Sequence, residues 1–326
     1  MATAQAQALE TDHRTLIEGC GLLDRSERGK LALTGADAIE FLNGQVTNEL
    51  AGMHAGDGCY AAFLTHKGKM LGDLRVLALG DEPGTPPREL ALDTERVALQ
   101  SLFDMIRRYR IGFDVELHKR TLERALLSLI GPASSTVAGA EHVGAGEHAN
   151  APLELDGVAA LAVRTDVGVD LLCAAGERER CEAALLARGA VAVGEEAVEC
   201  LRVEHGRPRY GVDLDDTVIP QEAGLNARAV SFTKGCYVGQ ETVARLYYKG
   251  KPNRHLRGLR LSGPAERGAE LLLGERTVGR TGTCVVSPRL GPIALALVRR
   301  EAEPGSRVSI AGGGAAEVVE LPFLAV

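Results

Sequence analysis

The chain of 326 residues contains no tryptophan, and aromatic residues make up only 4% of it. Flat side chains on which nucleic-acid bases stack are therefore scarce. The formal net charge of −7 also argues against a broad nucleic-acid-binding surface, because such a surface needs a cluster of basic residues. A basic run such as Arg107–Arg110 is more often merely solvated. We expect no nucleic-acid partner.

Several common binding motifs are also missing. No CxxC pair occurs, so the chain carries no self-contained zinc or iron–sulfur motif, and we expect no resident metal. His142 and His148 fall in a Gly/Ala-rich stretch without a nearby cysteine, and we interpret them as bystanders. Neither GxGxxG nor GxxxxGK[ST] is present, which removes the usual support for nicotinamide and P-loop nucleotide binding. The seven cysteines, an odd number, fit reduced thiols better than a disulfide framework.

Long apolar runs are absent as well. None reaches the roughly 18–20 residues that a membrane helix needs, and the N-terminal residues have neither the basic nor the apolar region of a secretion signal. We therefore expect no membrane partner and a cytoplasmic location. Apolar residues at 45% and charged residues at 25% indicate a globular protein. The length predicts two or three compact units.

The first part of the chain alternates strands and helices in an order typical of an α+β domain with a largely antiparallel sheet. Residues 1–11 are expected to be a mobile tail. We expect Asp93 and Thr94 to cap a helix that runs to about Arg108. A helix is predicted over Thr34–Leu50, with a central break at Gly44. The predicted strands are Gly21–Asp24, Lys30–Leu33, Cys59–Thr65, Met70–Leu79, Glu89–Leu92, Ile111–Leu117 and Arg124–Ile130.

A second run of similar order follows, and after Tyr248 the pattern changes to short, evenly spaced strands with Gly and Pro turns, which is typical of a small closed barrel. We predict an α+β domain over 12–250, with similar halves at about 12–120 and 121–250, and a β-barrel over 251–326. The predicted elements are a loop at Ala138–Ala151, strands Val158–Arg164, Val169–Cys173 and Val191–Val193, helices Glu177–Arg188 and Glu195–Glu204, and barrel strands Leu256–Leu261, Ala269–Leu273, Thr277–Gly279, Thr281–Val286, Pro292–Val298, Arg307–Ile310 and Ala316–Leu321.

The stretch Ser231–Arg245 contains a thiol, an ammonium, a phenol, an amide, a carboxylate and a guanidinium within fifteen residues, together with two glycines. A helix is predicted from Tyr237 onward, with Cys236 at its N-terminus and Lys234 two residues away. Both features would lower the pKa of the Cys236 thiol and make it reactive or metal-ligating. The alternative is a buried, inert cysteine, because free cysteine is among the most buried residue types.

The KGCYVGQE motif at Lys234–Glu241, with Arg245 downstream, resembles the signature of the YgfZ family. These proteins are folate-binding relatives of the glycine cleavage T-protein, also called GcvT or aminomethyltransferase, and they support iron–sulfur proteins. Further segments similar to that superfamily run through most of the chain: Leu23–Ser26, Gly35–Leu42, Gln45–Asn48, Thr65–Asp73, Leu201–Gly211 and Ile219–Ala223.

The resemblance implies α+β subdomains and a C-terminal barrel arranged as a ring around a central, folate-sized channel that Cys236 faces. It also implies that tetrahydrofolate or another reduced folate is bound, with Glu204 contacting the pterin ring, since a carboxylate can accept two parallel N–H bonds. T-proteins have an acidic residue where this chain has Cys236. They also use an aspartate near the reacting folate nitrogens, and Asp93 lies in that region.

The other residues of the motif have two interpretations each. Tyr237 is a stacking wall for the pterin or a core aromatic. Gln240 and Glu241 hold a ligand or lie on a helix surface. Arg245 contacts the ligand or pairs with Glu241 at i,i+4. Likewise, Glu204 is either a ligand contact or an ordinary helix-surface carboxylate.

Three functions follow. The first is a tetrahydrofolate-binding accessory protein for iron–sulfur cluster assembly, maintenance or repair, with Cys236 as its thiol and iron–sulfur proteins as transient partners. The second is a folate-dependent aminomethyl or one-carbon transferase, which needs a positioned acid or base. The third is a folate-independent thiol redox sensor. The exchange of an acid for Cys236 favours the first, and we do not expect a standard aminomethyltransferase.

Overall fold

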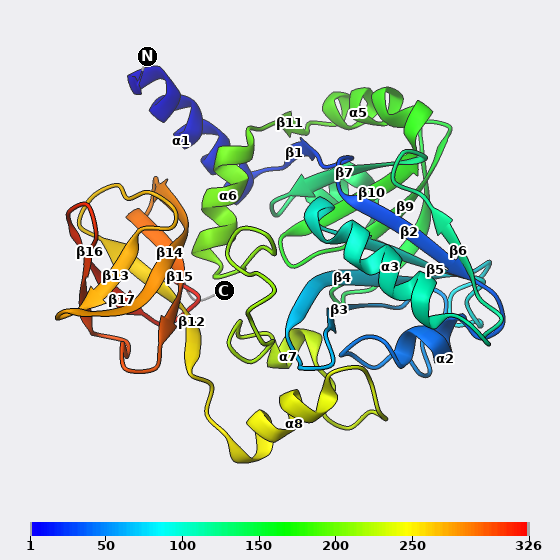
Figure 1. The fold of residues 1–326 in the computed structure, drawn as a ribbon. Coiled ribbons are helices and arrows are strands. Elements are labelled where there is room, and N and C mark those ends of the chain that lie inside the picture. Colours follow the sequence, from blue (N-terminus) through cyan, green and yellow to red (C-terminus); the bar gives the residue numbers. More distant parts are fainter. Residues whose placement is uncertain (1, 325–326) are drawn as a thin grey trace.

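The computed structural model describes residues 2–324 as two β-sheets with flanking helices and a separate closed barrel (Figure 1). The α+β domain and the C-terminal barrel expected from the sequence are confirmed. The first sheet is five-stranded and antiparallel, in the order β3-β4-β5-β2-β6. Its strands are β2 (Gly29–Thr34), β3 (Gly58–Leu64), β4 (Met70–Leu79), β5 (Glu89–Thr94) and β6 (Glu116–Lys119).

The predicted hairpin at the start of this sheet is confirmed. β3 and β4 pair directly, and the turn between them closes through the hydrogen bond from the Thr65 amide to the Lys69 carbonyl, 2.8 Å long. Gly68 in this turn has φ +75°, a left-handed conformation that glycine adopts without steric cost. The turn chemistry therefore fixes the register of β4, whose side chains reach the site described below.

The second sheet is six-stranded, in the order β11-β1-β7-β10-β9-β8. Strand β1 comes from the beginning of the chain and lies between β11, to which it is parallel, and β7, to which it is antiparallel. The sheet thus joins segments from both predicted halves. Its strands are β1 (Gly21–Asp24), β7 (Arg124–Ile130), β8 (Asn150–Leu155), β9 (Val158–Arg164), β10 (Gly168–Ala174) and β11 (Val191–Ala192).

The expected N-terminal tail was wrong: Ala2–Glu18 form helix α1, which extends from the body of the protein and contacts α6 (Figure 1). Leu16 on α1 is buried in a small cluster with Val198 and Leu201 of α6, so tertiary packing stabilises this helix. The other helices are α2 (Ala38–Asn43), α3 (Leu99–Tyr109), α4 (Ser134–Ala138), α5 (Arg178–Ala187), α6 (Glu195–Glu204), α7 (Asn226–Ala229) and α8 (Gln240–Lys249), with single 3₁₀ turns at Arg96–Ala98 and Ala175–Glu177.

Four further expectations need correction. Asp93 and Thr94 end strand β5 instead of capping a helix, and α3 begins only at Leu99. The predicted strand Ile111–Leu117 is largely a turn, and β6 starts at Glu116. The predicted loop Ala138–Ala151 begins in the last residue of α4 and ends in β8. The predicted helix Thr34–Leu50 is helical only at Ala38–Asn43.

The barrel closes in the order β12-β15-β14-β13-β16-β17. Two strands expected separately, Thr277–Gly279 and Thr281–Val286, form the single long strand β14, whose register shifts between Thr281 and Cys284. The predicted break at Arg280 was therefore wrong, because Arg280 is paired within the strand and the irregularity comes after Thr281. The strands are β12 (Arg254–Leu261), β13 (Glu270–Leu273), β14 (Arg276–Ser287), β15 (Gly291–Arg299), β16 (Arg307–Ile310) and β17 (Ala315–Val319).

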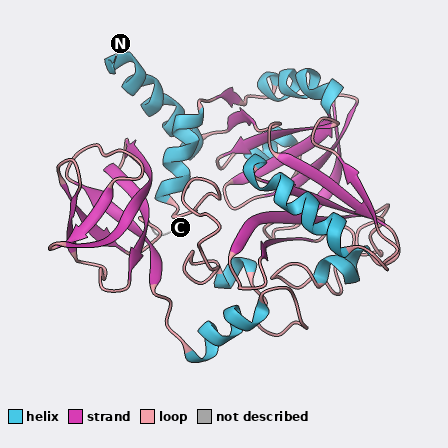
Figure 2. Cartoon of the chain, in the orientation of Figure 1, coloured by secondary structure: helices cyan, strands magenta, loops and turns pink. Residues whose placement is uncertain are grey.

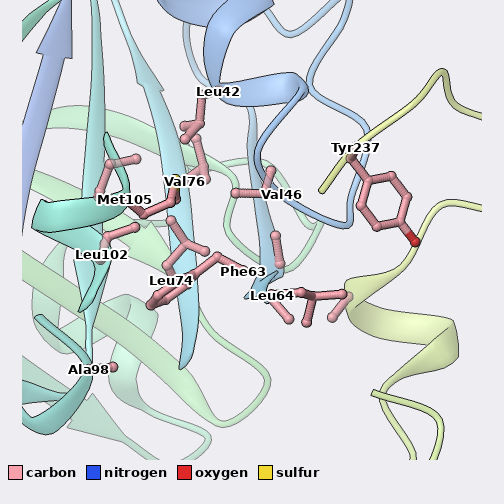
Figure 3. Packing of buried hydrophobic residues seen from close by; sticks show 14 of the residues in the cluster. Leu42, Val46, Phe63, Leu64, Leu74, Val76, Ala98, Leu102, Met105 and Tyr237 are labelled. Atoms are coloured by element: carbon pink, nitrogen blue, oxygen red, sulfur yellow. The ribbon is translucent and has the colours of Figure 1, made fainter. Parts of the chain in front are cut away.

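The chain between α6 and α8 is mostly loop (Figure 2), yet it packs on the core of the first sheet. Tyr210, Ile219, Val230 and Tyr237 belong to the same buried cluster as residues of β3 and β4. Figure 3 shows Tyr237 beside this cluster, across from Val46 and Leu64. The KGCYVGQE loop is therefore anchored on the first half. Within residues 2–324, no helix combines the length and the apolar content that crossing a bilayer requires.

Candidate functional site

A central pocket of about 1120 Å³, open mouth included, lies between the two sheets, α6 and the loop that follows α6. This size accommodates a drug-sized or cofactor-sized molecule. The polar and charged residues of its lining are Arg25, Arg28, Tyr60, Asp73, Arg75, Glu95, Ser128, Glu147, His148, Thr165, Asp166, Asp170, Arg202, His205, Arg207, Arg209, Tyr210 and Arg228.

A buried network of ion pairs centred on Asp93 joins three residues of the pocket lining, Arg28, Arg75 and Asp170. The guanidinium of Arg28 donates to Asp93 Oδ1 at 2.6 and 2.8 Å, and that of Arg75 donates to Oδ2 at 2.6 Å. Arg75 also donates to Asp170 at 2.5 Å. Burial alone would raise the pKa of Asp93, but the two guanidiniums outweigh it and hold this pKa far below its usual range. Asp93 is consequently a fixed anion.

Asp73 is the carboxylate of this pocket that no arginine contacts directly. Its Oδ2 accepts a hydrogen bond of 2.7 Å from the Tyr60 hydroxyl. Burial raises the pKa of Asp73 to about 6, because the charged form loses its hydration. A carboxyl group with this pKa both accepts and donates a proton near neutral pH.

Asp73 was not among the site residues predicted from the sequence, although the sequence contains a signal for it. Asp73 and Arg75 occupy alternate positions of β4, a strand otherwise dominated by apolar residues, and alternate residues of a strand point to the same face. Two charges on one face of an apolar strand indicate a buried polar site. Of the two histidines interpreted as bystanders, His148 lines this pocket and His142 is exposed.

A second, smaller pocket adjoins the first one and shares His205, Arg207, Pro208 and Arg228 with it. Leu256, Arg257 and the segment Glu320–Pro322 of the C-terminal domain also line it. The central pocket therefore extends toward the barrel. This arrangement accords with the expected site between the α+β subdomains and the barrel.

Glu204, at the end of α6, is fully buried and connects three parts of the chain. Its Oε1 accepts hydrogen bonds from His13 Nε2 of α1, at 3.0 Å, and from the Ser287 hydroxyl of β14. Burial raises its pKa, but these two hydrogen bonds more than compensate and lower it. Glu204 is not among the residues that line the central pocket, whereas Leu201 and His205 are. Its Oε2 is buried and has no partner in residues 2–324.

The predicted helix start at Tyr237 was wrong. Helix α8 begins at Gln240, and Gly239 precedes it with φ +84°; a Cβ at this position would lie 2.5 Å from the Thr65 carbonyl oxygen. Cys236 lies in the irregular segment before this turn and is exposed. The unpaired N–H groups of a helix N-terminus therefore do not surround its thiol.

Lys234 points into the protein instead of toward solvent. Its ammonium donates to the carbonyls of Asn43, Val46 and Asn48 at 2.5–3.0 Å and lies 5.3 Å from the centroid of the Tyr237 ring. Burial lowers the pKa of Lys234 to about 8 and raises that of Tyr237 to about 12. The two residues are brought together as an anchor of the loop, and neither lines the central pocket.

The remaining predicted site residues lie on or near the surface of α8. Gln240 Nε2 donates to the Gly235 carbonyl at 3.3 Å and so ties the helix to the loop. Glu241 and Arg245 are exposed, and no ion pair joins them in the part of the chain that the structure describes. Neither lines the central pocket.

Known proteins resemble the chain over almost its whole length. The family model of the GCVT N-terminal domain matches residues 2–234, and that of the glycine cleavage T-protein C-terminal barrel domain matches residues 254–324. An Arabidopsis thaliana protein named as a chloroplastic transferase is 28% identical, over 94% of this chain and 72% of the relative. An aminomethyltransferase of Streptomyces coelicolor is 30% identical, over 96% of this chain and 88% of the relative.

The crystal structure of the glycine cleavage system aminomethyltransferase T from Bartonella henselae has the same fold. The TM-score is 0.84 at 24% sequence identity, and the match covers 97% of this chain and 89% of that chain. None of the relatives named here is a YgfZ protein. The assignment of the chain to the YgfZ proteins within the superfamily therefore remains a proposal. The two matched models together span both the α+β domain and the barrel, and the chain therefore belongs to the family of the glycine cleavage T-protein.

Proposed function

We propose that the protein binds a reduced folate such as tetrahydrofolate in the central pocket. The observation that carries the proposal is the pocket itself, which combines the size for a cofactor-sized molecule with carboxylate, phenol, imidazole and guanidinium groups in a protein of the T-protein family. Carboxylates pair with the N–H groups of an aminopyrimidine, and guanidiniums pair with the carboxylates of a glutamate tail.

Glu204 remains the proposed partner of the pterin. Its support is the buried Oε2, since a carboxylate oxygen without a partner leaves room for a ligand's N–H donor. Because Glu204 is separated from the pocket lining by its helix neighbours, this role requires that the ligand reach past Leu201 or His205. Lys234, Tyr237 and Gln240 then act by holding the loop that carries Cys236, whereas Glu241 and Arg245 lie exposed on α8.

Glu204→Gln should weaken the binding of tetrahydrofolate by about 10- to 150-fold, because truncating a charge-assisted pair costs about 1.5–3 kcal/mol. Anaerobic calorimetric titration measures this change. The matched control is Glu196→Gln, an exposed residue of the same helix, which should bind like the wild type. Absence of binding by the wild-type protein rejects the folate proposal as a whole. Binding that Glu204→Gln leaves unchanged rejects only the role of Glu204.

We further propose that the folate-loaded protein supports iron–sulfur proteins through Cys236. The specific support is exposure: among the seven cysteines, Cys236 alone is exposed, while the others are buried or half-buried. The thiolate is the natural ligand of iron–sulfur clusters, and a single thiol suits transient contact with a partner better than storage of a cluster.

Cells that lack this protein should lose activity of iron–sulfur enzymes, more so under oxidative stress, and the wild-type gene should restore it. Cys236→Ala should not restore it, because the exposed ligand is gone. The half-buried Cys284 provides the matched control, and Cys284→Ala should complement fully. If Cys236→Ala complements as well as the wild type, the accessory role of this thiol is refuted.

A second candidate function is folate-dependent one-carbon transfer, and Asp73 supports it. Asp93 was expected in the region of the aspartate that T-proteins use, but two guanidiniums hold it as a fixed anion. Asp73 has no such partner, and its pKa of about 6 suits proton transfer. An aminomethyl-transfer assay separates the candidates: a useful rate that Asp73→Asn abolishes establishes the transferase and removes the need for Cys236.

A further inference from the structure

His148 is a buried side chain whose hydrogen-bonding capacity is unused. It is 6% exposed, it lines the central pocket, and neither ring nitrogen has a hydrogen-bond partner among the described residues. The nearest carboxylate oxygen, Glu147 Oε1, lies 3.5 Å from Nε2 without forming a hydrogen bond. Because buried polar atoms are almost always paired in folded proteins, two unpaired nitrogens on one side chain require an explanation.

The backbone at this position is also unusual, and neighbouring residues of β9 and β3 contact it. His148 has φ +71°, a left-handed conformation that is uncommon for residues other than glycine. Its amide donates to the Arg164 carbonyl at 2.8 Å. A Cβ on Gly58 of β3 would lie 2.3 Å from the His148 carbonyl oxygen, so the close approach depends on glycine there. Strained, over-determined backbone of this kind clusters at functional sites.

The imidazole is neutral and faces aromatic and cationic groups. Burial, with Arg75 and Arg228 adding to it and Glu147 and Asp93 opposing it, lowers the pKa of His148 to about 4. At neutral pH one ring nitrogen is therefore a donor and the other an acceptor. The Tyr60 ring lies 6.4 Å away at 37°, and the Arg228 guanidinium lies 5.2 Å from the centroid of that ring. This side of the pocket is thus built from planar groups.

We propose that His148 is a ligand-recognition residue of the central pocket, whose two ring nitrogens exchange hydrogen bonds with a planar heteroaromatic group that offers both a donor and an acceptor. The inference rests on the proposed function, in which this group is the pterin of a reduced folate. The strained backbone presents the ring to the pocket, and the ligand supplies the hydrogen bonds that the ring lacks in the free protein. Tyr60 and Arg228 add flat surfaces against which such a group packs.

The test is a titration with 5-formyltetrahydrofolate, a stable reduced folate. His148→Phe keeps the flat ring and removes both nitrogens, so its Kd should rise on the order of 10- to 100-fold, about tenfold for each hydrogen bond lost. His148→Gln retains a donor and an acceptor and should recover part of the affinity. The matched control is His142→Phe, an exposed histidine of the same loop, which should bind like the wild type.

Thermal unfolding without ligand separates recognition from a structural role. Removing two unpaired buried nitrogens favours the folded state, while phenylalanine tolerates φ +71° less well than histidine, so the Tm of His148→Phe should change little. A purely structural histidine would lower the Tm strongly and leave Kd unchanged. In the wild type, the ¹⁵N resonances of the His148 ring should shift when the folate is added. Unchanged Kd or unshifted resonances overturn the role of His148 alone. Absence of folate binding by the wild type overturns this role together with the proposed function.

Discussion

Asp93→Ala should destabilise the protein by about 3–5 kcal/mol, the largest stability effect that we expect from a single substitution. The carboxylate is buried at the centre of the network and satisfies both Arg28 and Arg75. Its removal leaves two buried guanidiniums with fewer anionic partners, and a buried charge without its partner is costly. Urea denaturation at pH 7.5, followed by far-UV circular dichroism, measures the change.

The matched control for this substitution is Asp81→Ala. Asp81 also pairs with an arginine, Arg88, but both side chains are mostly exposed, so the loss should be within about 1 kcal/mol. Should Asp93→Ala not accumulate in folded form, Asp93→Asn preserves the shape and allows the measurement. If the Asp93 variants lose no more free energy of unfolding than the control does, the network does not contribute to the stability of the fold.

Asp73→Asn should do the opposite and stabilise the protein at pH 7.5, by up to about 3 kcal/mol. The pKa of Asp73 is raised to about 6 in the folded protein, whereas an unfolded aspartate has a pKa of about 3.9. The folded state therefore holds the proton of Asp73 more tightly than the unfolded state does. The contribution of this group to the stability of the wild type is fully present below about pH 4. It is lost as the pH rises from about 4 to about 6. Asparagine has no charge to bury and keeps a carbonyl for the Tyr60 hydroxyl.

The measurement is the free energy of unfolding between pH 4 and pH 8 for the wild type and for Asp73→Asn. The difference between the two should grow between about pH 4 and pH 6 and then stay constant. Asp104→Asn, an exposed substitution on α3, should follow the wild type at every pH. A difference that does not change with pH would contradict the raised pKa. A stabilised variant that has lost function would identify Asp73 as a residue kept for chemistry at the expense of stability.

Local patterns predicted much of the fold. The hairpin of β3 and β4, the helix Glu195–Glu204 and the barrel strands followed from periodicity and turn residues. The N-terminal helix was missed because its apolar residues are sparse, and Leu16 is buried by contacts with α6, Ile130 and Val193. Single-sequence periodicity does not contain this tertiary contact.

The site was harder to predict, because its contacts join residues that are distant in sequence. Asp93 has the chemistry of a helix cap, and only the structure brings Arg28 beside it. Glu204 likewise pairs with His13 and Ser287 from distant elements. The helix start within the motif around Cys236 was mispredicted, because it depended on which glycine adopts φ > 0. Gly239, not Gly235, does so.

The position of strand β1 has a consequence for how the protein is made. Gly21–Asp24 pairs on one side with β7 and on the other with β11, both of which the ribosome produces much later. Until then, Gly21–Asp24 stays without its partner strands, which slows folding and exposes strand edges to other chains. A chain cut between Lys119 and Arg124 would separate β1 from β7, so neither product could complete the second sheet.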